Sequence, residues 1–149
     1  MEFELIEDFT LPNFRRAFKQ YFKELGIEID HDHKMFKSMT DDGGNYAFTL
    51  TIDAEMVAFI QFRVDQLNHW FFSEKFLFIR EFWVKESLRN QQLGSQLLER
   101  CEQYAKEQKL TKIILTSDTA EHFYLKHGFI IDGSMSAKNG DPVFVKFLG

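Results

Sequence analysis

The first residues that indicate a chemical function lie in the loop that follows the apolar run from Phe76 to Val84. This loop carries one arginine, Arg89, and a glycine, Gly94, and an amphipathic helix begins directly after it. A strand that leads through a polar loop into a helix directs backbone N–H groups and the positive end of the helix dipole toward one point. The loop therefore predicts a binding site for a phosphate or pyrophosphate, and with it a nucleotide-like ligand.

Composition limits the classes of protein to which the chain can belong. Its 149 residues fit one domain, residues 1–149, and an apolar fraction of 44% with 18 phenylalanines predicts a folded core. A net charge of −5 argues against nucleic acid as a partner and is compatible with cationic substrates such as amines. A single cysteine, Cys101, excludes an internal disulfide and favours a reducing compartment. The N-terminus does not resemble a signal peptide and no apolar run would span a bilayer, so we expect a cytoplasmic protein without a membrane partner.

The pattern of apolar residues predicts the elements that must position this loop. Apolar residues on one face, with charged residues on the other, predict a helix over residues 92–108 that lies on a sheet. The segment 65–75 is expected to be a loop. Together the elements indicate a mixed α/β sheet with helices on its faces. Strands are expected at 2–7, 46–52, 56–64, 76–84, 113–115, 129–132 and 143–148, and further helices at 12–25, 31–40 and 119–127.

Two segments together resemble the GNAT superfamily of acyl-CoA-dependent N-acetyltransferases. The family's loop pattern places an arginine at Arg89 and a glycine or alanine at Gly94, with Gln92 standing where a glycine is usual. The second segment, residues 120–129, has Phe-Tyr, Lys and Gly-Phe at the family's intervals. The resemblance implies a mixed, mostly antiparallel twisted sheet of six to seven strands flanked by about four helices. Asn90 and Gln92 in place of glycine, and Ser117 in place of an asparagine, depart from the pattern.

The resemblance also implies acetyl-CoA as co-substrate and assigns residues to it. The backbone of the strand end would pair with the pantetheine arm as an added strand. The N–H groups of the loop and the helix start would hold the pyrophosphate, with positive charge from Arg89. The predicted donor-binding residues are Phe82, Trp83, Val84, Arg89, Asn90, Gln91, Gln92, Leu93, Gly94, Ser95 and Ser117.

The same resemblance assigns the chemistry of acyl transfer. Tyr124 matches the general acid that protonates the departing thiolate, and Glu81 matches a position that is often acidic, as base or substrate anchor. A base that acts through water is an equal alternative to Glu81. His69 and Trp70 lie in the predicted loop where an acceptor pocket would be, and aromatic rings there can enclose an ammonium; the alternative is that they cover the core. The pairs His31/Asp30 and His33/Asp32 lack a second ligand cluster, so we expect no metal site.

The resulting hypothesis is an N-acetyltransferase that acts on a primary amine of a small molecule or a peptide. The acetyl group is expected to pass directly in a ternary complex, because no activated nucleophile stands out to carry it. Family members are often dimers, so a homodimer is compatible with the resemblance. Two alternatives remain: a GNAT-like domain that binds acyl-CoA as a sensor or interaction module without catalysis, and a loop that merely connects a strand to a helix.

Overall fold

Seven strands form one sheet in the order β1-β2-β3-β4-β5-β7-β6 in the computed structural model, which describes residues 1–149 apart from the side chain of His69. Neighbouring strands are antiparallel except for β4 and β5, which are parallel. The predicted mixed, mostly antiparallel sheet of six to seven strands is therefore confirmed. The strands are β1 (Glu2–Ile6), β2 (Asn45–Ile52), β3 (Glu55–His69), β4 (Phe72–Val84), β5 (Lys112–Thr116), β6 (Ile130–Ile131) and β7 (Val143–Phe147).

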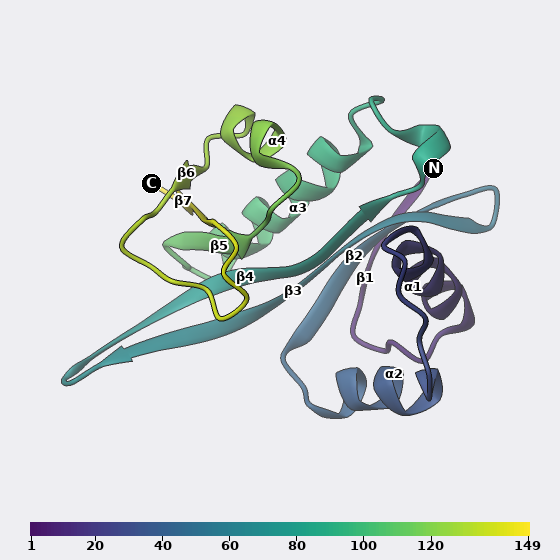
Figure 1. The fold of residues 1–149 in the computed structure, drawn as a ribbon, viewed down its shortest axis with the longest axis horizontal. Coiled ribbons are helices and arrows are strands. Elements are labelled where there is room, and N and C mark those ends of the chain that lie inside the picture. Colours follow the sequence, from purple (N-terminus) through teal and green to yellow (C-terminus); the bar gives the residue numbers. More distant parts are fainter.

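Four α-helices cover the two faces of this sheet. Figure 1 shows α3 and α4 above the long diagonal strands and α1 and α2 below them. The four helices lie at or close to the segments 12–25, 31–40, 92–108 and 119–127, for which helices were expected. Apolar periodicity predicted the first and third of these, because an amphipathic helix buries its apolar face against the sheet. The helices are α1 (Pro12–Glu24), α2 (Asp32–Asp41), α3 (Leu93–Glu107) and α4 (Glu121–Lys126), and a 3₁₀ turn, η1, covers Glu86–Leu88.

The two faces of the sheet carry two different cores. Leu97, Leu98 and Cys101 of α3 are buried in a core of aliphatic and aromatic side chains on one side. On the other side, phenylalanines of α1 and α2 pack on the sheet, and the rings of Phe18 and Phe59 stack 5.7 Å apart between centroids. Aromatic pairs at such distances add to the burial of apolar area. Much of the high phenylalanine content therefore fixes α1 and α2 against β3.

The prediction of a loop over residues 65–75 is wrong. β3 and β4 continue to pair through this segment, with Gln66 opposite Lys75 and Asn68 opposite Ser73. They form a long hairpin that projects beyond the body of the molecule, at the lower left in Figure 1. The hairpin closes through Trp70, whose φ of 44° is left-handed. The sequence has no Asn-Gly or Asp-Gly signal at this turn, which is the signal that normally reveals such a connection.

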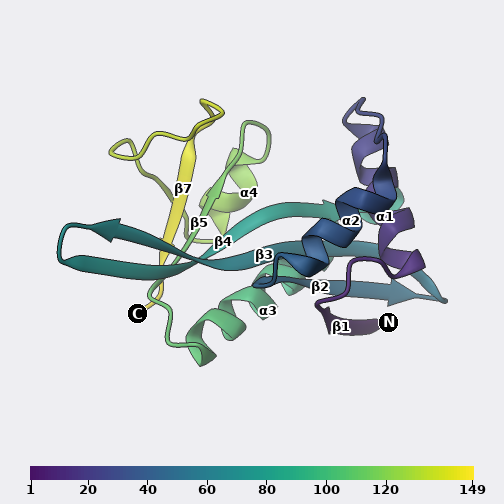
Figure 2. The same cartoon turned by 90° about the horizontal axis from the view of Figure 1, so that it is seen from below.

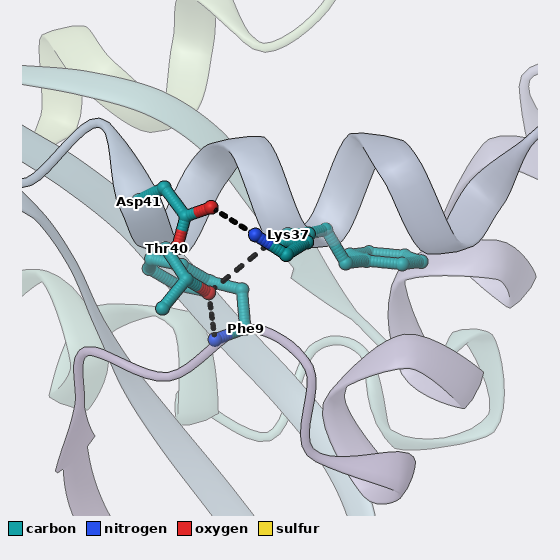
Figure 3. A network of polar contacts seen from close by, with 5 residues as sticks. Phe9, Lys37, Thr40 and Asp41 are labelled. Atoms are coloured by element: carbon teal, nitrogen blue, oxygen red, sulfur yellow. Dashed lines mark hydrogen bonds and ion pairs between the residues drawn. The ribbon is translucent and has the colours of Figure 1, made fainter.

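A hydrogen-bond network fixes α2 to the segment that precedes α1. The Phe9 N–H donates to Thr40 Oγ1 at 2.9 Å, and the Thr40 hydroxyl donates to the Phe36 carbonyl at 3.1 Å (Figure 3). Lys37 and Asp41, one turn apart, pair on the exposed side of the same helix at 2.6 Å. Figure 2 shows α2 running across the sheet beside α1. The last turn of α2 is therefore held in place over β2 and β3.

Candidate functional site

A cavity opens where β4 and β5 part. In the described residues the two strands pair only at Leu77 with Ile113 and at Phe78 with Ile114. Beyond this point β4 continues along β3 to Val84, and β5 no longer covers its other edge. A cavity of about 1050 Å³ lies there, which we call the donor cavity, and Phe82, Trp83 and Val84 line it. The strand end predicted to pair with an extended ligand therefore faces open space.

The loop after β4 contains two residues other than glycine in a left-handed backbone conformation. Asn90 and Gln92 have φ values of 65° and 63°, in the left-handed region. Gln92 is the N-cap of α3, and its side chain makes no capping hydrogen bond. The first backbone bond of the helix is from Gln96 N–H to Gln92 carbonyl oxygen at 3.1 Å, so the N–H groups of residues 93–95 precede it. These groups and the helix dipole meet at the donor cavity, which Gly94 and Ser95 also line.

Arg89 is held at the mouth of the donor cavity by the end of α1. Its Nη2 lies 2.6 Å from Glu24 Oε2, and its Nε donates to the Val84 carbonyl at 2.9 Å. The indole N–H of Trp83 donates to the same Glu24 oxygen at 3.2 Å. The predicted cation is thus in place, but a carboxylate already partners it.

Tyr124 lies inside the donor cavity rather than on the surface. It is 7% exposed and its ring packs against Phe129 and Phe144 in the core under α4. Burial raises the pKa of its hydroxyl to about 12. The phenol therefore stays protonated at physiological pH and can act as a hydrogen-bond and proton donor.

A β-bulge in β4 sets the position of Glu81. The register shifts so that Gln61 opposes Glu81 while the next residue of β3, Phe62, opposes Ile79. The additional residue is Arg80, and both Arg80 and Glu81 face the side of α1 and α2. Glu81 Oε2 accepts a hydrogen bond of 2.5 Å from the Tyr21 hydroxyl. Burial raises the pKa of the Glu81 carboxyl, and the Tyr21 bond opposes part of that rise.

Tyr21 connects this carboxylate with the donor cavity. Its ring lines the donor cavity together with Tyr124, while its hydroxyl reaches Glu81. Burial, followed by the neighbouring Glu81 charge, raises the pKa of the Tyr21 hydroxyl. Tyr21 therefore lies between the predicted acid, Tyr124, and the predicted base, Glu81.

Most of the residues predicted to hold the donor meet in one place. Of the residues predicted for this role, Gln91 and Ser117 do not line the donor cavity. Ser117 Oγ instead accepts from the N–H groups of Thr119 and Ala120 at 3.4 and 3.3 Å, just before α4. The predicted residues that line it are Phe82, Trp83, Val84, Arg89, Asn90, Gln92, Leu93, Gly94, Ser95 and Tyr124.

The residues predicted for an acceptor pocket lie elsewhere. Trp70 is 99% exposed at the tip of the β3–β4 hairpin and does not line the donor cavity. The side chain of His69 lies outside the described part of the chain. Their part in substrate binding stays a prediction.

Several residues of the donor cavity were not predicted. Tyr21 and Glu24 come from α1, and Phe123 and His127 come from α4 and its end. Ser95 Oγ lies 2.9 Å from His127 Nε2 across the cavity wall. The spacing of Tyr21 and Glu24 predicts that they share one face of α1, because they are three positions apart on a helix. Nothing in the sequence indicates that this face meets β4.

Two further properties follow from the described residues. The described residues contain no group of three or more histidine, cysteine, aspartate or glutamate side chains placed to hold a metal ion. No helix in this part of the chain combines the length and the apolar character needed to cross a membrane.

Comparison with known proteins agrees with this geometry. Residues 5–129 match the model of the Acetyltransferase (GNAT) family. The chain belongs to this family, and the resemblance seen in its loop and in residues 120–129 is confirmed. Among curated proteins, no sequence matches the chain significantly.

Solved structures share the fold at low sequence identity. An aminoglycoside 6′-N-acetyltransferase complexed with coenzyme A is 17% identical, with a TM-score of 0.73 over 99% of this chain and 97% of that chain. A PaiA N-acetyltransferase from Thermoplasma acidophilum, in complex with coenzyme A, is 14% identical with a TM-score of 0.68 over 99% and 100%. A predicted acetyltransferase with acetyl-CoA from Clostridium acetobutylicum is 18% identical with a TM-score of 0.74 over 91% and 94%.

Proposed function

We propose that this protein is an N-acetyltransferase that uses acetyl-CoA to acetylate a primary amine. The observation that carries this proposal is the donor cavity, in which an uncovered strand edge, the N-terminus of α3 and the Tyr124 phenol meet. Family membership supports acetyl transfer, and the structures named above were solved with coenzyme A or acetyl-CoA.

The chain's own groups fit a ligand of this kind. A volume of about 1050 Å³ suits a long cofactor, since cavities for ordinary small ligands span about 300–1,000 Å³. The N–H groups of residues 93–95 and the left-handed turn at Gln92 make an anion cradle of the kind that binds pyrophosphate. The backbone of Phe82 and Val84 offers hydrogen-bonding groups to an extended arm. Bound acetyl-CoA would supply the acetyl group as an activated thioester.

Proton movements are assigned to two residues. Tyr124 Oη holds the proton that a departing thiolate needs, and its raised pKa keeps that proton in place until negative charge develops on the sulfur. Glu81 takes the proton that the amine must lose, directly or through water. Because burial raises the pKa of Glu81, this carboxylate is a stronger base than an exposed glutamate.

Direct transfer within a ternary complex remains the preferred order of events. Cys101 is fully buried in the core and burial raises its pKa, so it does not present a thiolate to the donor cavity. The Ser95–His127 pair does lie in the donor cavity, but at the N-terminus of α3, where the pyrophosphate is expected. We therefore expect Ser95→Ala to alter donor binding rather than abolish turnover.

Substitution of Tyr124 by phenylalanine tests the proposal. We expect kcat for CoA release to fall by about 10²- to 10⁴-fold, the range for loss of a general acid, while the Kd for acetyl-CoA stays unchanged. Tyr104→Phe is the matched control, because Tyr104 is a partly buried tyrosine of α3 that does not line the donor cavity. An unchanged rate in Tyr124→Phe would remove the acid role.

Binding alone tests the alternatives. If calorimetry detects no acetyl-CoA binding and Arg89→Ala matches the wild type, the loop is only a connection and the proposal is wrong. If acetyl-CoA binds but a broad panel of amines gives no CoA release, the domain is a sensor or interaction module.

A further inference from the structure

A second cavity lies on the opposite face of the sheet, under α1 and α2. It has a volume of about 330 Å³, and we call it the acceptor cavity. Four apolar side chains form much of its wall: Phe18 and Phe22 from α1, and Met35 and Met39 from α2. The network at Thr40 that anchors the end of α2 keeps this wall in position over β3.

An unpartnered polar atom lies in this apolar surrounding. Gln61 of β3 is 1% exposed and lines the acceptor cavity. Its Nε2 donates only to the sulfur of Met39, at 3.5 Å, and its Oε1 has no hydrogen-bond partner among the described residues. A buried polar atom of this kind is rare in folded proteins because it loses its water without replacement. Gln61 Oε1 could therefore accept a hydrogen bond from a ligand bound in the cavity.

Gln61 is placed beside a carboxylate. It is the direct cross-strand partner of Glu81, so the Cβ atoms of the two side chains are neighbours on one face. One oxygen of Glu81, Oε2, accepts from Tyr21, and Glu81 also lines the acceptor cavity. A nitrogen donor placed here would meet two acceptors, one amide oxygen and one carboxylate oxygen.

The charges around the cavity favour a cation. Glu81 and Asp42 carry negative charge, and the only cation among the lining residues is Arg80, whose Nη1 donates to Asn45 Oδ1 at 3.0 Å. The sum is one net negative charge. The aromatic rings of Phe18 and Phe22 add the electrostatic attraction of their faces for an ammonium group.

We propose that the acceptor cavity binds a compact primary amine with an apolar arm, whose ammonium is held between Gln61 Oε1 and Glu81 while the arm packs on Phe18, Phe22, Met35 and Met39. The volume of about 330 Å³ suits a molecule of about the size of an arylalkylamine. The amine nitrogen then lies beside Tyr21, whose ring lines the donor cavity. Its role as acetyl acceptor rests on the proposed transferase function, whereas its binding does not.

The methionines provide a direct test. Protein labelled with ¹³C at the methionine methyl groups is titrated with phenethylamine in the absence of acetyl-CoA. We expect the signals of Met35 and Met39 to shift with a single saturable Kd, while those of Met1 and Met135, which line neither cavity, do not move. 2-Phenylethanol has the same arm without the charge, and we expect it to bind at least about tenfold more weakly. Equal binding of the alcohol, or no shift of Met35 and Met39 with the amine, would overturn the proposal.

Gln61→Leu isolates the amide oxygen. It keeps the volume but removes the acceptor, and we expect amine affinity to fall by about tenfold to a hundredfold, as for loss of a hydrogen bond to a charged group. Its Tm should not fall, because an unsatisfied polar atom is also removed. Thr49→Val is the matched control: it removes a buried hydroxyl of β2 that lines neither cavity, and amine affinity should be unchanged. Glu81→Gln gives an independent measure through the loss of charge.

The outcomes separate this inference from the proposed function. Amine binding at Met35 and Met39 without acetylation, in protein that binds acetyl-CoA, supports the amine site and refutes the transferase. Acetylation of amines with unshifted methionines, and with Gln61→Leu equal to wild type in affinity and KM, refutes the amine site and supports the transferase.

Discussion

Gln92 occupies a backbone conformation that disfavours any residue except glycine, so Gln92→Gly should stabilise the protein. Its φ of 63° and ψ of 17° are left-handed. This conformation costs about 1–2 kcal/mol for a residue with a Cβ, and a new glycine costs about 0.5–1 kcal/mol through the added freedom of the unfolded chain. The net gain is therefore about 0–1.5 kcal/mol, and about 0.75 kcal/mol at the middle of both ranges.

The matched control is Gln91→Gly, in the same loop. Gln91 is not left-handed, so this variant has the same unfolded-chain penalty without relief of strain. The difference between the two variants is then the strain alone, about 1–2 kcal/mol. For a domain of this size, 1 kcal/mol shifts Tm by roughly 2–4 °C. Thermal unfolding should therefore place Gln92→Gly about 2–8 °C above Gln91→Gly.

The same variant separates strain from ligand binding. Gln92 already has the left-handed turn in the free protein, so the strain is present before and after a donor binds and cancels in the binding free energy. We expect the Kd for acetyl-CoA, measured by calorimetry, to stay within about threefold of wild type. Equal Tm values for Gln92→Gly and Gln91→Gly would show that the left-handed conformation of Gln92 does not destabilise the protein. A Kd improved tenfold or more would show that Gln92 reaches the turn only when the donor binds.

Two further predictions concern the polar pairs around the donor cavity. Glu24→Gln releases Arg89 from a half-exposed ion pair worth about 0.2–1 kcal/mol. Acetyl-CoA should therefore bind about 1.4-fold to fivefold more tightly at low salt, and titration calorimetry should find this gain reduced at high salt. Tyr21→Phe removes the hydrogen bond that lowers the pKa of Glu81, so this pKa should rise further above its ordinary value. Because the base must be ionised, activity falls as pH drops through the pKa of Glu81. The acidic limb of the pH–rate profile should therefore move to higher pH in Tyr21→Phe. An acidic limb at the wild-type position would contradict Glu81 as the base.

The donor site was largely predictable because its signals are local. The polar loop and the start of α3 follow from a few consecutive residues, and Tyr124 follows from the spacing within residues 120–129. The left-handed conformation of Asn90 and Gln92 has no such local signal. Backbone N–H groups at a helix start bind through the main chain, so most side chains there can vary. This explains how Asn90 and Gln92 can replace glycine and still line the cavity.

The contacts of α1 with β4 and with the loop after it were not predictable, because they join residues that are far apart in the sequence. Tyr21 and Glu81 are 60 positions apart, and Glu24 and Arg89 are 65 apart. Neither pair has a local pattern that would reveal it. The prediction of a loop over residues 65–75 was wrong for a related reason. The pairing of the two strands with each other, rather than the propensity of these residues, extends β3 and β4.

The bulge at Arg80 explains why one strand can serve both faces of the sheet. Ile79 and Phe82 both pack with the core beneath α3, although strict alternation over three positions would place them on opposite faces. The extra residue restores the phase and leaves Arg80 and Glu81 together on the side of α1 and α2. The carboxylate proposed to deprotonate the amine thus lies on one face, and the Tyr124 phenol proposed to protonate the thiolate packs in the core of the other. Because burial raises the pKa of both groups, one becomes a better base and the other keeps its proton, which is the division of roles that acyl transfer to an amine requires.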